Sequence, residues 1–151
     1  MEEVARAVGV ARPTLYAWFD SKEELFRAAT EQALTRDLNA CEQTLADRSR
    51  RLPTRVLNAF DRWAGQYVGP LSHELRSVIE STPELLSPVA SAAPARFQEL
   101  VTRAITETTG RERAREVAQT LISASIGIKH QVDTRQAYRR RMAIAVDLLL
   151  P

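Results

Sequence analysis

The chain has 151 residues, of which 44% are hydrophobic, which is enough for one domain with a normal core and at most a small appendage. The net charge of +2 permits nucleic-acid binding without requiring it, and the single cysteine, Cys41, excludes an intrachain disulfide framework. The sequence shows no apolar run of membrane-spanning length and no secretory signal at its start. Few glycines and prolines beside many Ala, Leu, Arg and Glu residues favour an all-α protein, and the lone cysteine suits the reducing cytoplasm.

Residues 1–25 predict two short helices and the start of a third. Apolar residues at helical spacing indicate a first helix that ends at Gly9, a residue that adopts positive φ at little cost. Pro13 suits the first turn of a second helix, where its missing N–H would be unpaired anyway. Asp20 or Ser21 is expected to cap the third helix. Two short helices joined by a glycine turn form a helix-turn-helix, whose second helix can enter a DNA major groove. The apolar positions are Val4, Ala5, Val8, Leu15, Trp18 and Phe19.

At these residues the chain resembles the TetR family of bacterial transcriptional repressors. The most specific part is a Tyr-x-x-Phe pattern followed by Ser-Lys-Glu-x-Leu, and a weaker resemblance as a run of helices extends to the end of the chain. The resemblance implies a helix-turn-helix head on a helical body that binds a small molecule and dimerises. The matching positions are Val4, Ala5, Gly9, Val10, Thr14, Leu15, Tyr16, Phe19, Lys22, Glu23 and Leu25.

Two departures from the family pattern stand out. In the family another helix precedes this motif, so we expect the head to be incomplete and to lack that first helix. Lost residues, a mis-set start or a truncation would each account for it. The second departure is Ala11, where the family usually has a Ser or Thr cap, and an alanine cap typically costs about 1 kcal/mol.

The resemblance also implies which side chains contact DNA. Residues at the start and near the end of the second helix would face base edges or nearby phosphates, and two others would bind the phosphate backbone. The first set is Arg12, Pro13, Thr14 and Trp18, and the second is Tyr16 and Lys22. The alternative is an ordinary surface helix with Trp18 half-buried in the core. Residues 1–25 are slightly acidic, so their bulk charge does not itself favour DNA binding.

The rest of the chain is expected to be helical. We predict helices over residues 21–46, 54–68 and 71–79, then a segment broken by Pro83, Pro88 and Pro94, in which residues 84–89 form one or two turns. A helix around Phe97 should end at Gly110, and a long helix should cover residues 111–131. Asp133 or Thr134 should cap the last helix. We divide the chain into a head with its connecting helix, 1–46, and a ligand-binding and dimerisation domain, 47–151.

An aromatic stripe marks the expected effector site in the body. Aromatic side chains with a few polar groups suit a small-molecule pocket, and Trp63 and Tyr67 are the best candidates because each carries a polar atom. The alternative is that the stripe is simply core. The expected contacts are Phe60, Trp63, Tyr67, Ile79, Phe97 and Val101, with Leu75 and Val78 nearby.

The last two helices are expected to form a homodimer interface, as the resemblance implies. Residues 142–150 are almost wholly apolar, so all sides of this run should be buried. On a monomer these helices would leave apolar surface exposed at Leu121, Ile128, Ile144, Leu148 and Leu149. The alternative is an intrachain core. We place Lys129 and His130 on a helix surface or in the interface.

No pattern for catalysis or cofactor binding was found. The chain has only two histidines, His73 and His130, and shows no zinc-type cluster, phosphate loop or nucleophile elbow. We therefore interpret the chain as a non-enzymatic, TetR-like DNA-binding regulator without a cofactor. It would be a repressor that a small-molecule effector releases from double-stranded operator DNA. The alternative is a truncated module that binds ligand and dimerises without binding DNA.

Overall fold

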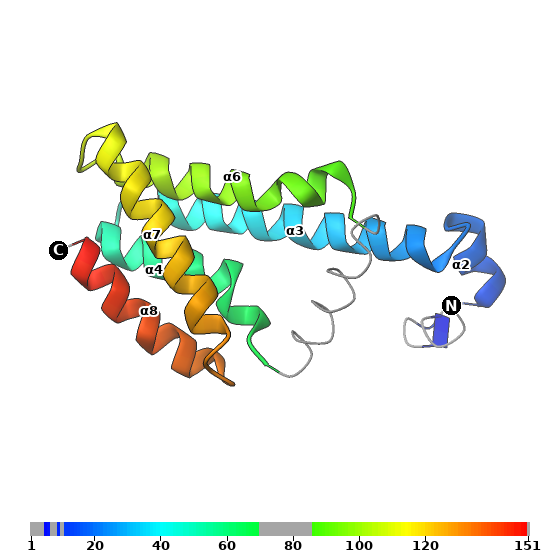
Figure 1. The fold of residues 1–151 in the computed structure, drawn as a ribbon. Coiled ribbons are helices and arrows are strands. Elements are labelled where there is room, and N and C mark those ends of the chain that lie inside the picture. The colour runs from blue at the N-terminus through cyan, green and yellow to red at the C-terminus, as the bar shows by residue number, and fades with distance from the viewer. Residues whose placement is uncertain (1–4, 7–8, 10, 70–85, 151) are drawn as a thin grey trace.

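The computed structural model describes residues 5–6, 9, 11–69 and 86–150 of the chain. Its described part consists of six α-helices and one short 3-10 helix and contains no strand (Figure 1). The all-α fold class is thereby confirmed. A small head at one end of the molecule is joined by one long helix to a bundle of helices at the other.

The head contains helix α2, Arg12–Trp18, and the beginning of α3, Lys22–Ala46. Gly9 has a φ of 73°, which agrees with its expected role in the turn before α2. Ala11 stands at the N-cap of α2 and makes no side-chain cap. Of the two candidate caps for α3, Ser21 serves, since its hydroxyl accepts a hydrogen bond from the Glu24 N–H at 3.1 Å. The Glu24 carboxylate accepts in return from the Asp20 N–H at 2.7 Å. Two backbone N–H groups at the start of α3 therefore have side-chain acceptors.

The body is formed by α4 (Leu52–Trp63), the 3-10 helix η1 (Gly65–Tyr67), α6 (Pro88–Ile105), α7 (Arg111–Lys129) and α8 (Arg135–Leu149). The C-terminal part of α3 packs against α4 and α6, while α8 packs against α4 and α7. In Figure 1, α6 lies along α3. The fully buried side chains at the centre of this body include Val56, Phe60, Phe97, Val101, Ile105, Leu121, Tyr138, Met142 and Val146.

Three predicted boundaries were wrong. The helix expected over 54–68 ends at Trp63 and tightens into η1, where Gly65 fits because a Cβ there would lie 2.6 Å from the Asp61 carboxylate. Pro94 lies inside α6 without breaking it: its ring is exposed, and the buried Ala90, Ala93 and Phe97 hold the opposite face. Gly110 does not end that helix but stands at the N-cap of α7. The helix expected over 71–79 and residues 84–85 lie outside the described residues.

The last helix also differs from expectation. Thr134, one of the two candidate caps, accepts from the Ala137 N–H at 3.2 Å. Met142, Val146 and Leu150 are buried, but Ile144 and Leu148 are exposed, so within one chain the apolar run 142–150 is covered on one side only. The helix is amphipathic within the chain and presents a second apolar face outward.

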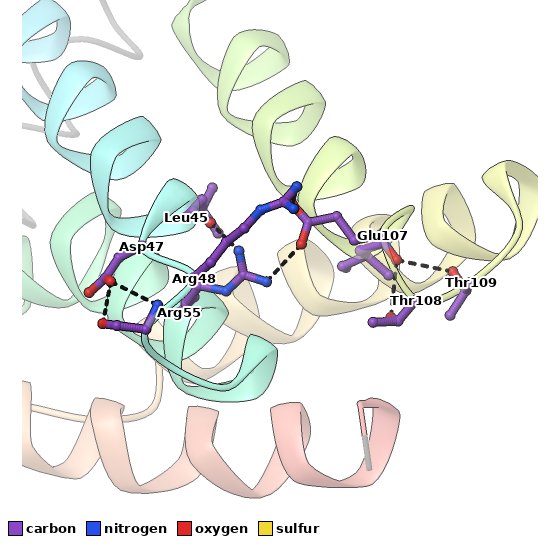
Figure 2. Close-up of polar contacts among 9 residues, drawn as sticks. Leu45, Asp47, Arg48, Arg55, Glu107, Thr108 and Thr109 are labelled. Atoms are coloured by element: carbon purple, nitrogen blue, oxygen red, sulfur yellow. Dashed lines mark hydrogen bonds and ion pairs between the residues drawn. The ribbon is translucent and has the colours of Figure 1, made fainter.

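The buried Arg55 holds the end of α3 in the body (Figure 2). Its guanidinium donates to the Leu45 carbonyl at 2.6 Å and to the Glu107 carboxylate at 2.9 Å. Arg48 pairs with the other oxygen of Glu107 at 3.2 Å. Because Leu45 lies in the last turn of α3, its carbonyl has no partner within the helix. Arg55 therefore ties α4, the end of α3 and the turn after α6 together.

Replacing Arg55 with alanine should destabilise the fold by roughly 2 kcal/mol or more, because it leaves a helix-end carbonyl and a carboxylate without their buried donor. Urea unfolding measures the change. The control is Arg113→Ala, which removes an exposed partner of Glu116 and should change stability by less than about 0.5 kcal/mol. Equal effects of the two variants would contradict the assigned role of Arg55.

Glu107 should make part of this stability dependent on pH. The hydrogen bond from Arg55 lowers the pKa of the Glu107 carboxyl below its usual value. A lowered folded-state pKa stabilises the fold above the unfolded-state pKa, and this contribution is lost as the pH falls through the folded-state value. The stability difference between wild type and Glu107→Gln should therefore shrink as the pH falls from about 7 to about 3. A difference that stays constant in urea titrations across this range would refute the prediction.

Candidate nucleic-acid interface

Helix α2 has one face turned into the head. Leu15 is only 4% exposed and clusters with Ala5, while Phe19 and Leu25 pack against both. Leu15 lies in the middle of α2 and Phe19 is its C-cap, and both belong to the contacts by which α2 meets the rest of the head. This small core fixes which side of α2 is left outward.

The side chains expected to contact DNA lie on the outward side of α2 and at the start of α3. Trp18 is 65% exposed and Tyr16 41% exposed, so Trp18 does not belong to the core. Arg12 and Tyr16 stand one helical turn apart, and the Arg12 guanidinium lies 5.5 Å from the centre of the Tyr16 ring. Arg12, Pro13, Tyr16, Trp18 and Lys22 are exposed, and Thr14 is partly buried.

This arrangement combines the two kinds of group that a DNA-binding surface needs. Cationic and hydroxyl groups bind phosphates and set the position of a protein on the duplex, whereas groups that enter the groove read bases. Arg12 and Lys22 supply positive charge, and the Tyr16 hydroxyl can donate to a phosphate. Thr14 and Trp18 share a face of α2 four residues apart, beside the face that carries Arg12 and Tyr16.

In the body, the structure brings three of the expected effector residues together. The Phe60 and Phe97 rings meet edge to face with centroids 5.1 Å apart, and the Trp63 ring stacks on Phe97 at 4.9 Å. Phe60, Phe97 and Val101 are at most 1% exposed, whereas Trp63 is half-buried. The inner part of this stripe is filled core, and Trp63 forms its accessible edge. Ile79, Leu75 and Val78 lie outside the described residues.

Tyr67 has a polar partner that the sequence analysis missed. Its hydroxyl donates to the carboxylate of Asp37 on α3, which also accepts from the Gln66 side-chain amide at 2.9 Å. Burial and this hydrogen bond raise the pKa of Tyr67 to about 12, so its hydroxyl stays protonated as a donor. Asp37 lies four residues before the buried Cys41 and therefore falls on the apolar face of α3. A carboxylate on an apolar helix face was the sequence signal for a buried polar partner.

A hollow of about 760 Å³ lies along α3, and its described lining comes from that helix alone. Six of its eight described lining residues carry polar side chains, and none of the five described effector candidates belongs to it. The lining residues are Ala28, Glu31, Gln32, Thr35, Arg36, Asn39, Ala40 and Gln43.

The last two helices leave three large apolar side chains in solvent. Ile126 on α7 is 55% exposed, and Ile144 and Leu148 on α8 are 59% and 77% exposed. Of the residues expected to be exposed on a monomer, Leu121 is instead fully buried within the chain, because it lies on the side of α7 that faces the body core. Ile128 and Leu149 are partly buried against that core. His130 is the exposed C-cap of α7, next to the half-buried Lys129.

Among the described helices, none has the length and apolar character needed to cross a membrane. Within the same part of the chain, no group of three or more His, Cys, Asp or Glu side chains is placed to hold a metal ion.

Comparison with known families gives one match, to the bacterial regulatory proteins of the tetR family, over residues 1–29. Comparisons with curated proteins and with solved structures give no match. The matched range contains α2, the turn before it and the first turns of α3, which are the elements that carry the exposed side chains described above. The match covers the head and not the body, so it identifies residues 1–29 as similar to the DNA-binding segment of the tetR family of bacterial regulatory proteins.

Proposed function

We propose that the protein is a transcriptional repressor that binds operator DNA as a homodimer and is released from it by a small-molecule effector. The observation that carries the proposal is the outward side of α2, where family-matched side chains stand exposed on a head that continues directly into α3. A dimer would place two such helices in successive major grooves of a palindromic site. Arg12, Pro13, Thr14 and Trp18 would face bases and nearby phosphates, while Tyr16 and Lys22 would bind the phosphate backbone.

The proposed dimer interface is the pair of helices α7 and α8. Ile144 and Leu148 lie four residues apart on α8, and the half-buried Ile122 and exposed Ile126 lie four residues apart on α7. Each helix therefore offers a stripe of apolar side chains at helical spacing. A second copy of the same pair would cover both stripes in a four-helix interface, as a symmetric dimer does with one self-complementary surface.

Leu148→Asp should convert the dimer into a monomer, because it would place a carboxylate in the centre of the buried apolar stripe. Light scattering at micromolar concentration measures the mass. The matched control is Val89→Asp at the start of α6, which changes an apolar residue that is 42% exposed outside this pair of helices and should leave the dimer intact. A wild-type protein that elutes as a monomer would refute the interface.

The proposed effector site lies at the accessible edge of the aromatic cluster. Phe60, Phe97 and Val101 are already closely packed, so a ligand would have to reach Trp63 and Tyr67 by moving them from their present partners. Trp63 stacks on Phe97, and Tyr67 is bonded to α3. A ligand that moves Tyr67 would therefore act on the helix that carries the head. Ile79 completes the proposed set of contacts.

Lys22→Ala should weaken DNA binding by a similar factor for all sequences and reduce the slope of log affinity against log salt by about one unit per half-site. Tyr16→Phe should weaken binding in the same sequence-independent way, because a phosphate contact carries no base information. Changes at Arg12 or Thr14 should instead alter sequence preference. Gel shifts with the DNA upstream of the chain's own reading frame, over a range of salt concentrations, measure these effects.

The control for charge is Arg113→Ala, which removes one exposed cation from α7 in the body. It should leave the salt slope unchanged. The assignment of Lys22 fails if Lys22→Ala and Arg113→Ala give the same affinity and slope as wild type. A protein that shifts no DNA at any salt concentration would contradict the proposed function itself.

A further inference from the structure

A buried carboxylate joins the long helix α3 to the 3-10 helix η1. Asp37 is only 5% exposed. One of its oxygens accepts from the Arg36 guanidinium at 3.1 and 3.2 Å, and the other accepts from the Gln66 amide and the Tyr67 hydroxyl. These partners satisfy the side-chain oxygens of Asp37 in a place where an unpaired carboxyl group would be strongly disfavoured. We call this group of four residues the Asp37 junction.

The junction stands where α3 enters the body. Counted from the head, Asp37 is the first fully buried residue of α3, and the buried Leu38, Cys41 and Leu45 follow it. All residues of α3 before Asp37 are exposed or only partly buried. In Figure 1 this first part of α3 reaches from the body to α2. A contact at Asp37 is therefore well placed to set the direction in which α3 leaves the body.

The other side of the junction is held firmly. A Cβ on Gly65 would lie 2.9 Å from the Tyr138 ring and 2.6 Å from the Asp61 carboxylate, so η1 sits tightly on α8 and α4. Asp61 is fixed in turn by Arg135, which pairs with its two oxygens at 3.1 and 2.8 Å. Because η1 cannot shift easily against the body, the bonds from Gln66 and Tyr67 transmit its position to α3.

We infer that the Asp37 junction holds α3, and with it the head, in the orientation that binds DNA, and that Asp37 and Tyr67 are the positioning residues that couple the body to the head. This inference rests on the proposed function, since it assigns the regulation of the same DNA-binding head. Asp37 touches no DNA in this account. Breaking the bond from Tyr67 releases α3 near residue 37 and lowers the population of the DNA-binding orientation.

The test compares Asp37→Ala, Tyr67→Phe and the double variant with wild type in two measurements. The first is affinity for the upstream DNA fragment. We expect each single variant to bind about 5- to 150-fold more weakly, the range of ordinary coupling between sites, and the double variant to bind no more weakly than the weaker single variant. Non-additivity of this kind is the mark of two groups that act through one bond.

The second measurement needs no DNA and uses Cys41, the only cysteine of the chain. Its thiol is fully buried one turn after Asp37 and donates to the Ala59 carbonyl on α4 at 3.5 Å. Burial raises its pKa to about 12, so the thiol should react with a disulfide reagent such as 5,5′-dithiobis(2-nitrobenzoic acid) only when α3 opens from α4. Under native conditions the junction variants should react faster than wild type.

The control variant is Val117→Ala, which removes buried methyl groups from α7, a helix that packs mainly on α6 and α8. It should leave both DNA affinity and Cys41 reactivity near wild type, so general destabilisation is separated from loss of the junction. Folded junction variants whose Cys41 reactivity equals that of Val117→Ala would overturn the inference, as would unchanged DNA affinity. If wild type shifts no DNA, the proposed function fails. The Cys41 rates then still decide whether the junction holds α3.

Discussion

A single continuous helix belongs to both parts of the molecule, and the rest of the structure is arranged around it. At 1.5 Å per residue, the 25 residues of α3 extend about 37 Å from the head to the far side of the body. Both ends are fixed by side chains: Ser21 caps the start, and Arg55 binds the Leu45 carbonyl near the end. Because α3 runs without a break between the two parts, we expect a change of its position in the body to be transmitted to the head.

The body surrounds α3 with an apolar core crossed by a few polar ties. Asp37 joins α3 to η1, Arg55 joins α4 to the turn after α6, and Asp61 joins α4 to α8 through Arg135. Ser125 and Tyr138 form another such tie between α7 and α8. An apolar core tolerates sliding of one helix past another better than paired polar groups do, because each buried polar group loses its partner when the register changes. These ties thus define the register that the apolar contacts alone leave loose.

The sequence was most informative where local chemistry decides the structure. The glycine turn, the caps at Ser21 and Thr134, and the exposed pattern of α2 all follow from short-range rules, and the family match falls on the same residues. Pro94 was wrongly predicted to interrupt the helix. The tendency of proline to break helices was outweighed by burial of Ala90, Ala93 and Phe97 on the other face of α6. The partners of Asp37 and Arg55 lie 30 and 52 residues away in sequence, and no local pattern encodes such pairs. For the same reason the aromatic stripe did not reveal which of its members were filled core and which lay at its edge.

We propose that the DNA-binding head and the core around Asp37 are coupled through α3. Coupling between two sites is reciprocal. If the packing of α3 on α4 favours DNA binding, DNA bound at the head must stabilise that packing by the same factor. The most direct measurement is the rate of Cys41 modification in the wild-type protein, with and without saturating upstream DNA. The account predicts that DNA slows the reaction of this buried thiol, although Cys41 lies in the body and touches no DNA, and that unrelated DNA of equal length slows it less. An unchanged rate at saturating DNA would contradict the account.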